Sequence, residues 1–423
     1  MTHRLIKIFL FSLFLANSAG FAQEQWKPFG KMPLPVADGQ AVVLNDKVYI
    51  LGGVSDSTGV PISAIQAFDP NADVGEQWKI VGHMLTPRAN FVAKAYQNVI
   101  LIAGGETGFE QSNVNAMEMW SPEKGSRIIV EGAKLNRIGA TGEIWNNLFI
   151  IIGGFYRSSI DAAANAVAAF DVFEHRDGFS LSLPQTLIPY NHASFMFKDT
   201  IYIAGGVRTG VSKRIFAISI KGLVPGRVQP ELLMPRASFE AVVVAPRVVW
   251  FIGGYNEDNR TLDAVSVFSR TGFGYQIEAA AKLHTGRREL MAAKLGDAIY
   301  VFGGRNNHNE IVPMVEKMEL SANTAVEEKK LHTFRLRQNY PNPFNPMTTI
   351  SFDVPQFGTV RLDIIAADGA LIKTLIKDHL QPGEHNVVWN GSDTGGQPVP
   401  SGVYFYKLTT ESFVEIRKML LVK

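Results

Sequence analysis

The sequence contains no cysteine among its 423 residues. Disulfides, thiolate metal sites and cysteine nucleophiles are therefore excluded. Beyond the first 25 residues the sequence also lacks any apolar run long enough to span a bilayer. Neither sign of charge dominates, since 41 Lys and Arg stand against 39 Asp and Glu. This balance argues against nucleic acid or an anionic membrane as the main partner.

Sequence motifs of metal and nucleotide sites are also missing. The nine histidines are scattered and show neither an H-E-x-x-H motif nor a pair at metal-binding spacing. The segment from Asp69, DPNADVGEQW, resembles the start of a calcium loop but lacks its glycine and glutamate. There is no G-x-S-x-G and no phosphate-binding loop. We therefore predict neither a metal site nor a cofactor.

The N-terminus has the pattern of a secretory signal peptide. Arg4 and Lys7 precede a short apolar run from Ile8 to Ala16, and small residues lead to Ala22. We predict that residues 1–22 are removed during export, although a membrane anchor is the alternative. The mature chain then carries 39 basic residues (41 minus two) against 39 acidic ones. No membrane-spanning segment is expected after this cleavage.

A repeat of about fifty residues occurs six times after the signal peptide. Each copy has an apolar strand-like run followed by two glycines, as in KVYILGG and AIYVFGG. The first glycines of these pairs are Gly52, Gly104, Gly153, Gly205, Gly253 and Gly303. Continuous apolar runs indicate strands that are covered on both faces. Four short strand-like segments per repeat are typical of a propeller blade.

These repeats resemble the Kelch family in their apolar strand, their diglycine and the tryptophan of the fourth strand in the first repeat. The resemblance covers residues 25–320 and implies an all-β fold with a six-bladed Kelch β-propeller over residues 23–320. The segment EQWKPFGKMPLP from Glu24 matches EQWKIVGHMLTP from Glu76 at seven of twelve positions. We therefore predict that the N-terminal segment supplies the fourth strand of the last blade and closes the ring.

A second domain is predicted after the propeller. Residues 321–346 read as a polar linker followed by the proline-rich stretch QNYPNPFNP, which we expect to be extended because proline restricts φ. In residues 347–423 apolar and polar residues alternate over several short segments, for example at Val360, Leu362 and Ile364. This pattern predicts a small Ig-like β-sandwich.

This C-terminal region resembles the sorting domain of type IX secretion substrates, an Ig-like sandwich similar to that of flagellar hook-capping proteins. The resemblance implies passage across the outer membrane, contact with the type IX machinery, and attachment to the cell surface or release. The alternative is an accessory Ig-like domain without a sorting role. The residues that match the sorting pattern are Pro341, Asn342, Pro343, Gly402, Tyr404, Lys418 and Lys423.

Arginines recur at one place in the repeat, 16 or 17 residues before the diglycine. They are Arg88, Arg137, Arg236 and Arg287, and His192 lies near this place in the fourth repeat. Repeat symmetry predicts that these residues surround the mouth of the central channel, where guanidinium groups suit a carboxylate or sugar-acid ligand. The alternative is that each arginine holds the blades together, as repeated positions often do.

The sequence favours a noncatalytic module that binds a protein or a glycan at the channel mouth. It leaves open a sugar-active enzyme, because sialic acid mutarotases are exported Kelch propellers that this chain resembles. That resemblance implies that Arg236 would hold a carboxylate and that Glu240 would exchange a proton. The two residues are four apart, so a strand would place both on one face.

Overall fold

The computed structural model describes residues 25–422 except 56–58, 109–113, 133–134, 136, 156–165, 173–175, 183–188, 223–224, 272–273, 321–333, 355–357, 381–382 and 411–412. The predicted signal peptide and Lys423 lie outside the described residues. The chain divides into two compact units, with the boundary at residue 325. The described residues contain no α-helix, and none of their elements is an apolar helix of membrane-spanning length.

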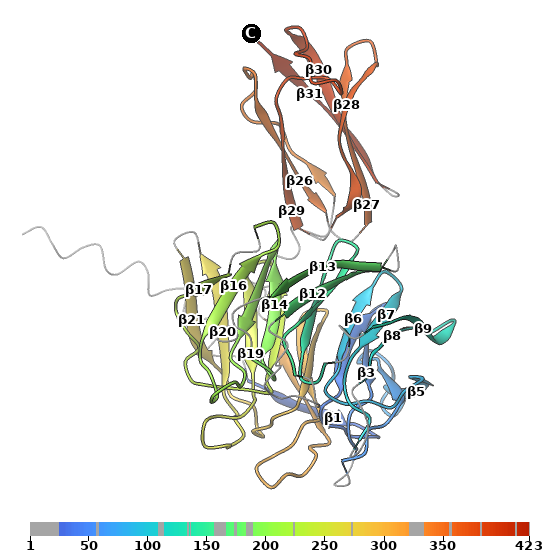
Figure 1. The fold of residues 1–423 in the computed structure, drawn as a ribbon, viewed down its shortest axis with the longest axis vertical. Helices are drawn as coiled ribbons and strands as arrows, with labels where there is room; N and C mark the ends of the chain where they lie inside the picture. Colours follow the sequence, from blue (N-terminus) through green and yellow to red (C-terminus); the bar gives the residue numbers. More distant parts are fainter. Residues whose placement is uncertain are drawn as a thin grey trace, which may run out of the picture. The chain divides into compact units, whose positions relative to one another are not determined.

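The first unit is a propeller whose described residues form six four-stranded antiparallel sheets (Figure 1). Blade 1 contains β2 (Gln40–Leu44), β3 (Lys47–Leu51), β4 (Ala64–Phe68) and β5 (Trp78–His83). Blade 2 contains β6 (Val92–Tyr96), β7 (Val99–Ala103), β8 (Ala116–Ser121) and β9 (Gly125–Glu131). Blade 3 contains β10 (Thr141–Trp145), β11 (Leu148–Ile152), β12 (Ala166–Asp171) and β13 (Arg176–Ser182).

The remaining blades follow the same order. Blade 4 contains β14 (Ala193–Phe197), β15 (Thr200–Ala204), β16 (Ile215–Ser219) and β17 (Pro225–Val228). Blade 5 contains β18 (Glu240–Ala245), β19 (Val248–Ile252), β20 (Val265–Thr271) and β21 (Gly274–Ala280). Blade 6 contains β22 (Met291–Leu295), β23 (Ala298–Phe302) and β24 (Met314–Glu319), and its fourth strand is β1 (Lys27–Lys31).

The second strand of each blade forms the middle of the core. In β3, β7, β11, β15 and β19 every residue after the first is buried, and β23 is buried throughout. Because neighbouring blades pack on both faces of these strands, they have no polar face, which explains the unbroken apolar runs in the sequence. The six-bladed all-β architecture predicted from the repeat is confirmed.

The diglycine that ends each second strand joins one blade to the next. The amide of Gly53 donates to the carbonyl of Arg88 at 2.9 Å, and the amide of Gly254 donates to that of Arg287 at 2.9 Å. A Cβ on Gly52 would lie 2.6 Å from the Arg88 carbonyl oxygen, and the φ of Gly52 is +56°. Glycine is therefore required both by the close approach of the next blade and by the left-handed backbone.

The N-terminal segment completes blade 6. β1 pairs antiparallel with β24, with Lys27 opposite Lys317 and Lys31 opposite Met314. Trp26 is 2% exposed and packs edge-on against Trp250 of blade 5, with ring centroids 6.3 Å apart. Its indole Nε1 donates to the carbonyl of Ala281 at 2.9 Å. This segment removes the free edge that β24 would otherwise present.

The second unit is a β-sandwich of two sheets (Figure 1). One sheet is formed by β25 (Arg335–Leu336), β26 (Thr348–Val354) and β29 (Gly383–Trp389). The other is formed by β27 (Gly358–Ala366), β28 (Leu371–Leu380), β30 (Gly402–Thr409) and β31 (Val414–Leu421). Inward residues of both sheets, such as Trp389, Tyr406 and Leu362, are fully buried between them.

The proline-rich stretch differs from our expectation of an extended segment that precedes the second domain and is kept extended by the restricted φ of its prolines. Phe344 is 3% exposed and packs against Trp389, with ring centroids 5.6 Å apart. Its amide donates to the carbonyl of Leu420 at 3.0 Å, and Tyr340 pairs with Thr349 through two backbone hydrogen bonds. The stretch is therefore part of the packed sandwich, because the ring of Phe344 is buried and the backbone amides of Tyr340 and Phe344 donate hydrogen bonds to neighbouring segments.

Candidate functional site

The centre of the propeller is closed by a ring of backbone hydrogen bonds. One residue just before the first strand of each blade donates its amide to the equivalent carbonyl of the preceding blade. The six bonds are 2.9 to 3.0 Å long and return to their starting point among the described residues. The ring residues are Asp38, Asn90, Gly139, Asn191, Ser238 and Glu289.

All six ring residues have a positive φ, between 47° and 62°. Glycine, asparagine and aspartate tolerate this conformation best. Gly139 meets a second constraint, because a Cβ there would lie 2.3 Å from Oδ1 of Asn191. The ring holds the first turn of every blade at a fixed place and gives the channel mouth a rigid border.

The side chains around this border form what we call the rim. The residue after each diglycine pairs with the residue just before the ring position, for example Tyr255 with Ala237 and Arg305 with Arg288. The rim residues that carry larger side chains are Glu106, Phe155, Tyr190, Tyr255, Arg288 and Arg305.

Aromatic side chains occupy the rim of blades 3, 4 and 5. The rings of Phe155 and Tyr190 are 5.1 Å apart, and the Arg288 guanidinium lies 5.8 Å from the centroid of Tyr255. Burial, and then proximity to Tyr190, raise the pKa of Tyr255, while a hydrogen bond with Asn191 opposes them. All three aromatic residues are half-buried, so part of each ring faces solvent.

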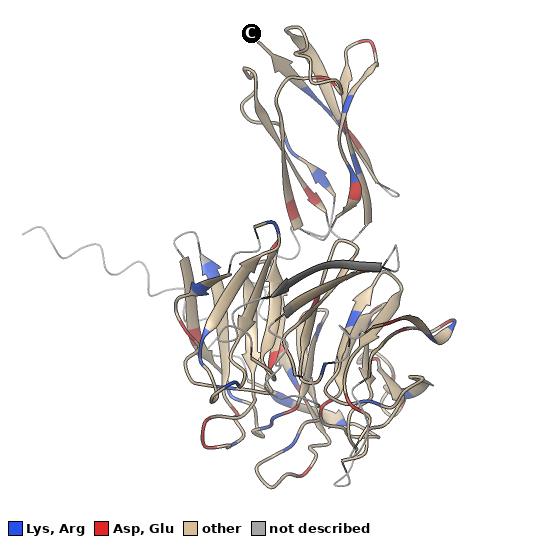
Figure 2. Cartoon of the chain, in the orientation of Figure 1, with Lys and Arg blue, Asp and Glu red and all other residues tan. Residues whose placement is uncertain are grey.

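Charged side chains occupy the rim of blades 6, 1 and 2. Glu289 accepts ion pairs from Arg305 at 3.2 Å and from Arg288 at 3.5 Å. Burial raises the pKa of Asp38 well above its usual value, and the neighbouring Glu289 carboxylate adds to the effect. Across the propeller as a whole, positive and negative residues are interspersed (Figure 2). The rim is thus divided into an aromatic side and a charged side.

The channel below the ring is narrow and polar. Its volume is about 110 Å³, which is small beside the roughly 300–1,000 Å³ of typical ligand pockets. Lys94, Thr141, Ser194 and Glu240 line it. The Ser194 hydroxyl donates to Glu143 at 2.6 Å, and the Lys94 ammonium lies 3.8 Å from the same carboxylate. A bulky ligand would therefore rest on the rim rather than enter the channel.

The four repeated arginines do not line the channel mouth. Arg88, Arg137, Arg236 and Arg287 are each at most 2% exposed and lie inside the blades. Three of them donate from Nη1 to the first diglycine carbonyl of their own blade, Arg88 to Gly104, Arg137 to Gly153 and Arg287 to Gly303, at 3.1 to 3.2 Å. These contacts favour the alternative that the arginines are architectural, because a ligand cannot reach a guanidinium that the blade has covered.

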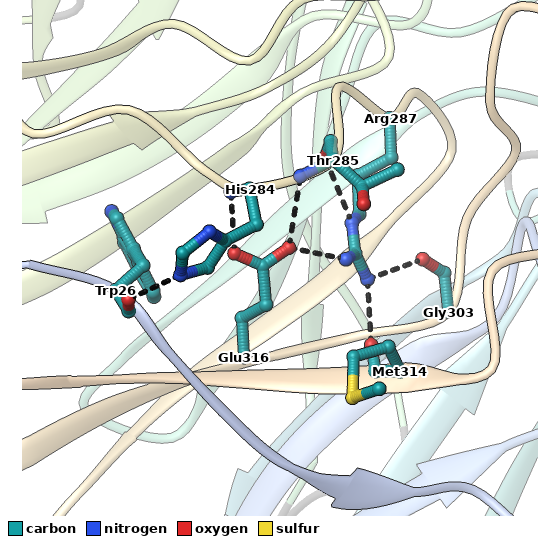
Figure 3. Close-up of polar contacts among 7 residues, drawn as sticks. All are labelled: Trp26, His284, Thr285, Arg287, Gly303, Met314 and Glu316. Carbon is teal, nitrogen blue, oxygen red and sulfur yellow. Dashed lines mark hydrogen bonds and ion pairs between the residues drawn. The ribbon is translucent and has the colours of Figure 1, made fainter.

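Two of the arginines form buried ion pairs. In blade 6 Arg287 contacts Glu316 with Nη2 at 2.5 Å and also donates to the Met314 carbonyl at 2.9 Å (Figure 3). Glu316 accepts a further hydrogen bond from the His284 amide at 2.7 Å. In blade 2 Arg88 and Glu118 make the same pair at 3.0 Å. Burial lowers the pKa of both arginines, and their glutamates oppose the effect.

Arg236 and Glu240 do not lie on one face of a strand as expected, because β18 begins at Glu240 and Arg236 is buried before it. Nη1 of Arg236 donates to the carbonyls of Phe251 and Ala264 at 3.3 and 3.4 Å, and burial lowers its pKa to about 10. Within the described residues no carboxylate lies within ion-pair distance of Arg236. Glu240 lines the channel instead, where burial raises its pKa to about 7 and Lys94 opposes the effect.

His192, like Glu240, is a predicted site residue that lines the channel. It is 3% exposed, and its Nε2 lies 2.7 Å from the Thr141 hydroxyl. Burial lowers the pKa of His192 to about 4. The imidazole of His192 is therefore neutral at physiological pH, and it contributes hydrogen bonding rather than charge.

The rim residues were missed because the arginines were the more regular signal. Each rim residue lies either immediately after a diglycine or immediately before a ring residue, and the residue type at these positions varies from blade to blade. Variation within a fixed scaffold is the pattern expected of a binding surface. The residue after the diglycine, which reads Glu106, Phe155, Tyr255 and Arg305 in four of the blades, could have identified the rim.

Three residues of the predicted sorting motif, Pro341, Asn342 and Tyr404, make hydrogen bonds within the second unit. The Pro341 carbonyl accepts from the Thr348 hydroxyl at 2.8 Å, and the side-chain oxygen of Asn342 accepts from the Leu420 amide at 2.9 Å. Tyr404 is 6% exposed and donates to the Pro400 carbonyl at 2.8 Å. Pro343 lies between Asn342 and the buried Phe344, Gly402 begins β30, and Lys418 is exposed on β31.

No metal site is found in the described part of the chain, which has no group of three or more His, Asp or Glu side chains suited to hold an ion. The polar groups of the rim and channel can thus offer hydrogen bonds, ion pairs and aromatic faces to a ligand.

Comparisons with known proteins agree with this fold. Residues 347–412 match the FlgD Ig-like domain. The chain is 24% identical over 259 residues to Kelch-like protein 36 of Rattus norvegicus, covering 58% of this chain and 40% of that protein. It is 22% identical over 243 residues to alpha-scruin of Limulus polyphemus, covering 54% of this chain and 25% of that protein. The chain thus spans less than half the length of these relatives.

A solved structure described as "Structure of YjhT" has a TM-score of 0.56 and 13% identity, covering 70% of this chain and 97% of the other. At this identity the likeness shows the fold alone. Together the fold and the similarities define a Kelch-type propeller followed by an Ig-like domain.

Proposed function

We propose that this protein is an exported, noncatalytic binding module whose propeller rim binds a glycan. The observation that carries the proposal is the division of the rim, where Phe155, Tyr190 and Tyr255 face solvent opposite a network of Glu289, Arg288 and Arg305. A sugar ring has apolar C–H faces and a hydroxyl edge. Aromatic faces on one side and hydrogen-bonding groups on the other complement both features.

The rigidity of the rim supports this proposal. Each rim side chain extends from backbone that the closed ring or an interblade hydrogen bond fixes in place. Ligand binding would therefore cost little conformational entropy of the protein. A protein partner that inserts a polar loop would use the same surface, and the experiment below distinguishes the two.

The test is a glycan array probed with the mature full-length chain and with two variants. We expect a defined set of glycans to bind, and Tyr190→Ala to weaken this binding at least about tenfold, since a lost stacking contact costs roughly 0.5–1.5 kcal/mol beyond its buried area. Tyr340→Ala is the matched control, because Tyr340 is 82% exposed in the second unit. Absence of any glycan binding, with a protein partner recovered instead, would contradict the glycan proposal.

Export is a separate part of the proposal. It is supported by the signal-peptide pattern of residues 1–22 and by the resemblance of the C-terminal region to type IX sorting domains. We expect the protein at the cell surface or in the medium of its host. Removal of residues 335–423 should leave the propeller in the periplasm, as cell fractionation would detect. Unchanged secretion of the truncated chain would contradict a sorting role for the second unit.

One observation favours a second candidate, a sugar-active enzyme. Glu240 lines the channel with a pKa of about 7, which suits proton exchange near neutral pH. Anomer-exchange NMR on any sugar that binds tests this candidate. Acceleration that Glu240→Gln abolishes would establish it, and exchange at the rate found in buffer would reject it.

A further inference from the structure

Blade 4 lacks the buried ion pair that blades 2 and 6 have at two equivalent positions. In blades 2 and 6 these positions hold the ion pairs Arg88–Glu118 and Arg287–Glu316. In blade 4 the first position, two residues before the ring residue Asn191, is Pro189. The second position, opposite Ile203 on β15, is Phe216, just as Glu118 is opposite Ile102 on β7.

A cavity lies where the ion pair would be. Its volume is about 480 Å³, and Pro189, Gly205 and Phe216 line it. Gly205 is the glycine whose counterpart in blade 2, Gly104, accepts a hydrogen bond from Arg88. The volume falls within the roughly 300–1,000 Å³ of small-molecule sites.

The loop above the cavity is short and well fixed. Eight residues, 207–214, join Gly206 to β16, whereas ten residues make the same connection in blades 1, 2 and 5. The Ser212 amide donates to the Gly206 carbonyl at 2.9 Å, and the Gly205 amide donates to the Arg214 carbonyl at 3.0 Å. Residues 208–214 of this loop form one wall of the cavity.

The walls of the cavity are basic above an apolar floor. The charged residues that line it are Arg208, Lys213, Arg214, Arg227, Glu231 and Glu257, a surplus of two positive charges. Glu231 is neutralised within the wall by Arg227 and by Lys213, which lies 3.3 Å away. Phe216, Val211 and Pro235 contribute the apolar surface.

We propose that this cavity binds an acidic sugar residue, with its carboxylate at Arg214 and its ring against Phe216. A guanidinium binds a carboxylate with two parallel hydrogen bonds, and an aromatic side chain packs on the C–H face of a sugar ring. Arg214, which does not contact Glu231, supplies the positive charge that the carboxylate of an acidic sugar would meet.

This site is independent of the rim. The cavity shares no lining residue with the central channel and none with the rim residues defined above. The protein would thus hold a glycan at two places, and loss of one site would leave the other intact. Failure of the rim proposal therefore does not imply failure of this one.

The first experiment compares three probes by ligand-observed NMR titration of the mature full-length chain. D-glucuronate and D-glucose share one ring and differ at the carboxylate, and acetate carries the carboxylate alone. We expect D-glucuronate to bind at about millimolar concentration and the other two to bind at least about tenfold more weakly. Equal binding of all three, or binding of none, would overturn the proposal.

The second experiment uses two arginine variants. Both side chains are exposed in loops that follow a diglycine, Arg214 beside the cavity and Arg260 in blade 5. Arg214→Gln should weaken D-glucuronate binding about tenfold or more, whereas Arg260→Gln should leave it unchanged. An equal effect of the two substitutions would show nonspecific attraction to positive charge and would overturn the assignment to this cavity.

A third variant fills the cavity. The double substitution Pro189→Arg with Phe216→Glu would restore the ion pair that blades 2 and 6 contain. We expect this variant to lose D-glucuronate binding while it keeps binding at the rim. Retained D-glucuronate binding in the folded variant would contradict the proposed location.

Discussion

Blades 5 and 6 contain the same buried arginine in different surroundings. In blade 6 Arg287 meets Glu316, and in blade 5 the equivalent of Glu316 is Ser266, opposite Phe251 on β19. Arg236 there keeps its bonds to backbone carbonyls, but its Nε and the Ser266 hydroxyl have no hydrogen-bond partner. Both blades nevertheless form a four-stranded sheet, and each contributes one equivalent residue to the ring of backbone hydrogen bonds.

The difference between the two blades shows which interactions of the buried arginine the fold requires. In both blades the backbone carbonyl of the arginine accepts a hydrogen bond from the diglycine of the preceding blade, Arg236 from Gly206 and Arg287 from Gly254. The carboxylate partner is present in one and absent in the other. The hydrogen bonds to backbone therefore suffice for the fold, while the ion pair affects how much free energy the burial of each guanidinium costs.

The largest expected effect is at the ion pair of blade 6. Glu316→Ala leaves Arg287 as an uncompensated buried charge, so we expect the free energy of unfolding to fall by about 3–5 kcal/mol. Urea denaturation measures this change. Glu319→Ala on the same strand is the control, because Glu319 is 60% exposed and its surface pair with Lys317 contributes about 0–1 kcal/mol. Similar losses in both variants would contradict the importance of the buried pair.

The next largest effect is expected where the N-terminal strand β1 pairs with β24 in blade 6, an arrangement that blade 5 does not have. Trp26→Ala removes the packing against Trp250 and the hydrogen bond to Ala281. We expect a loss of about 3 kcal/mol and faster hydrogen exchange of the β24 amides that pair with β1. Slow exchange at β24 in the variant would show that other contacts keep β1 paired with β24.

A smaller effect, which depends on pH, is expected at Glu240 in blade 5. The folded chain holds this proton more strongly than the unfolded chain, with a pKa of about 7 against 4.5. Stability therefore falls as the pH rises between these values, and the full cost is present above pH 7. Because Glu240 is partly exposed, Glu240→Gln should gain at most about 2 kcal/mol above pH 7 and little below pH 4.5. Thermal denaturation across this range measures the gain, and a pH-independent gain would contradict the assignment.

The smallest effect is expected from converting blade 5 to the pattern of blade 6. Ser266→Glu would place a carboxylate beside Arg236 and should raise the free energy of unfolding by about 1 kcal/mol. Ser266→Ala is the control and should be nearly neutral, because the hydroxyl has no partner to lose. Destabilisation by the glutamate would show that blade 5 has no room for it.

The repeat pattern predicted the architecture because it reflects local requirements. Runs such as residues 48–51 must be apolar when blades cover both faces, and each diglycine must lack a Cβ where the next blade approaches. The C-terminal sandwich was predicted from alternation at Val360, Leu362 and Ile364, which are all fully buried. Packing of the proline-rich stretch was not predicted, because the contact between Phe344 and Trp389 joins residues 45 positions apart.

The candidate site was harder to derive, because it depends on which side chains face the channel. The sequence by itself determined the number of blades and the places of the six diglycine turns, since a period of about fifty residues and the glycine pairs require no long-range contact to be recognised. The tertiary structure alone decided that the regular arginines lie inside the blades, that the variable rim residues lie mostly half-buried at the channel mouth, and that blade 4 has a cavity where blades 2 and 6 have an ion pair. Burial and cavities arise when distant segments pack together, so the repeat reveals the equivalent positions but not what surrounds them.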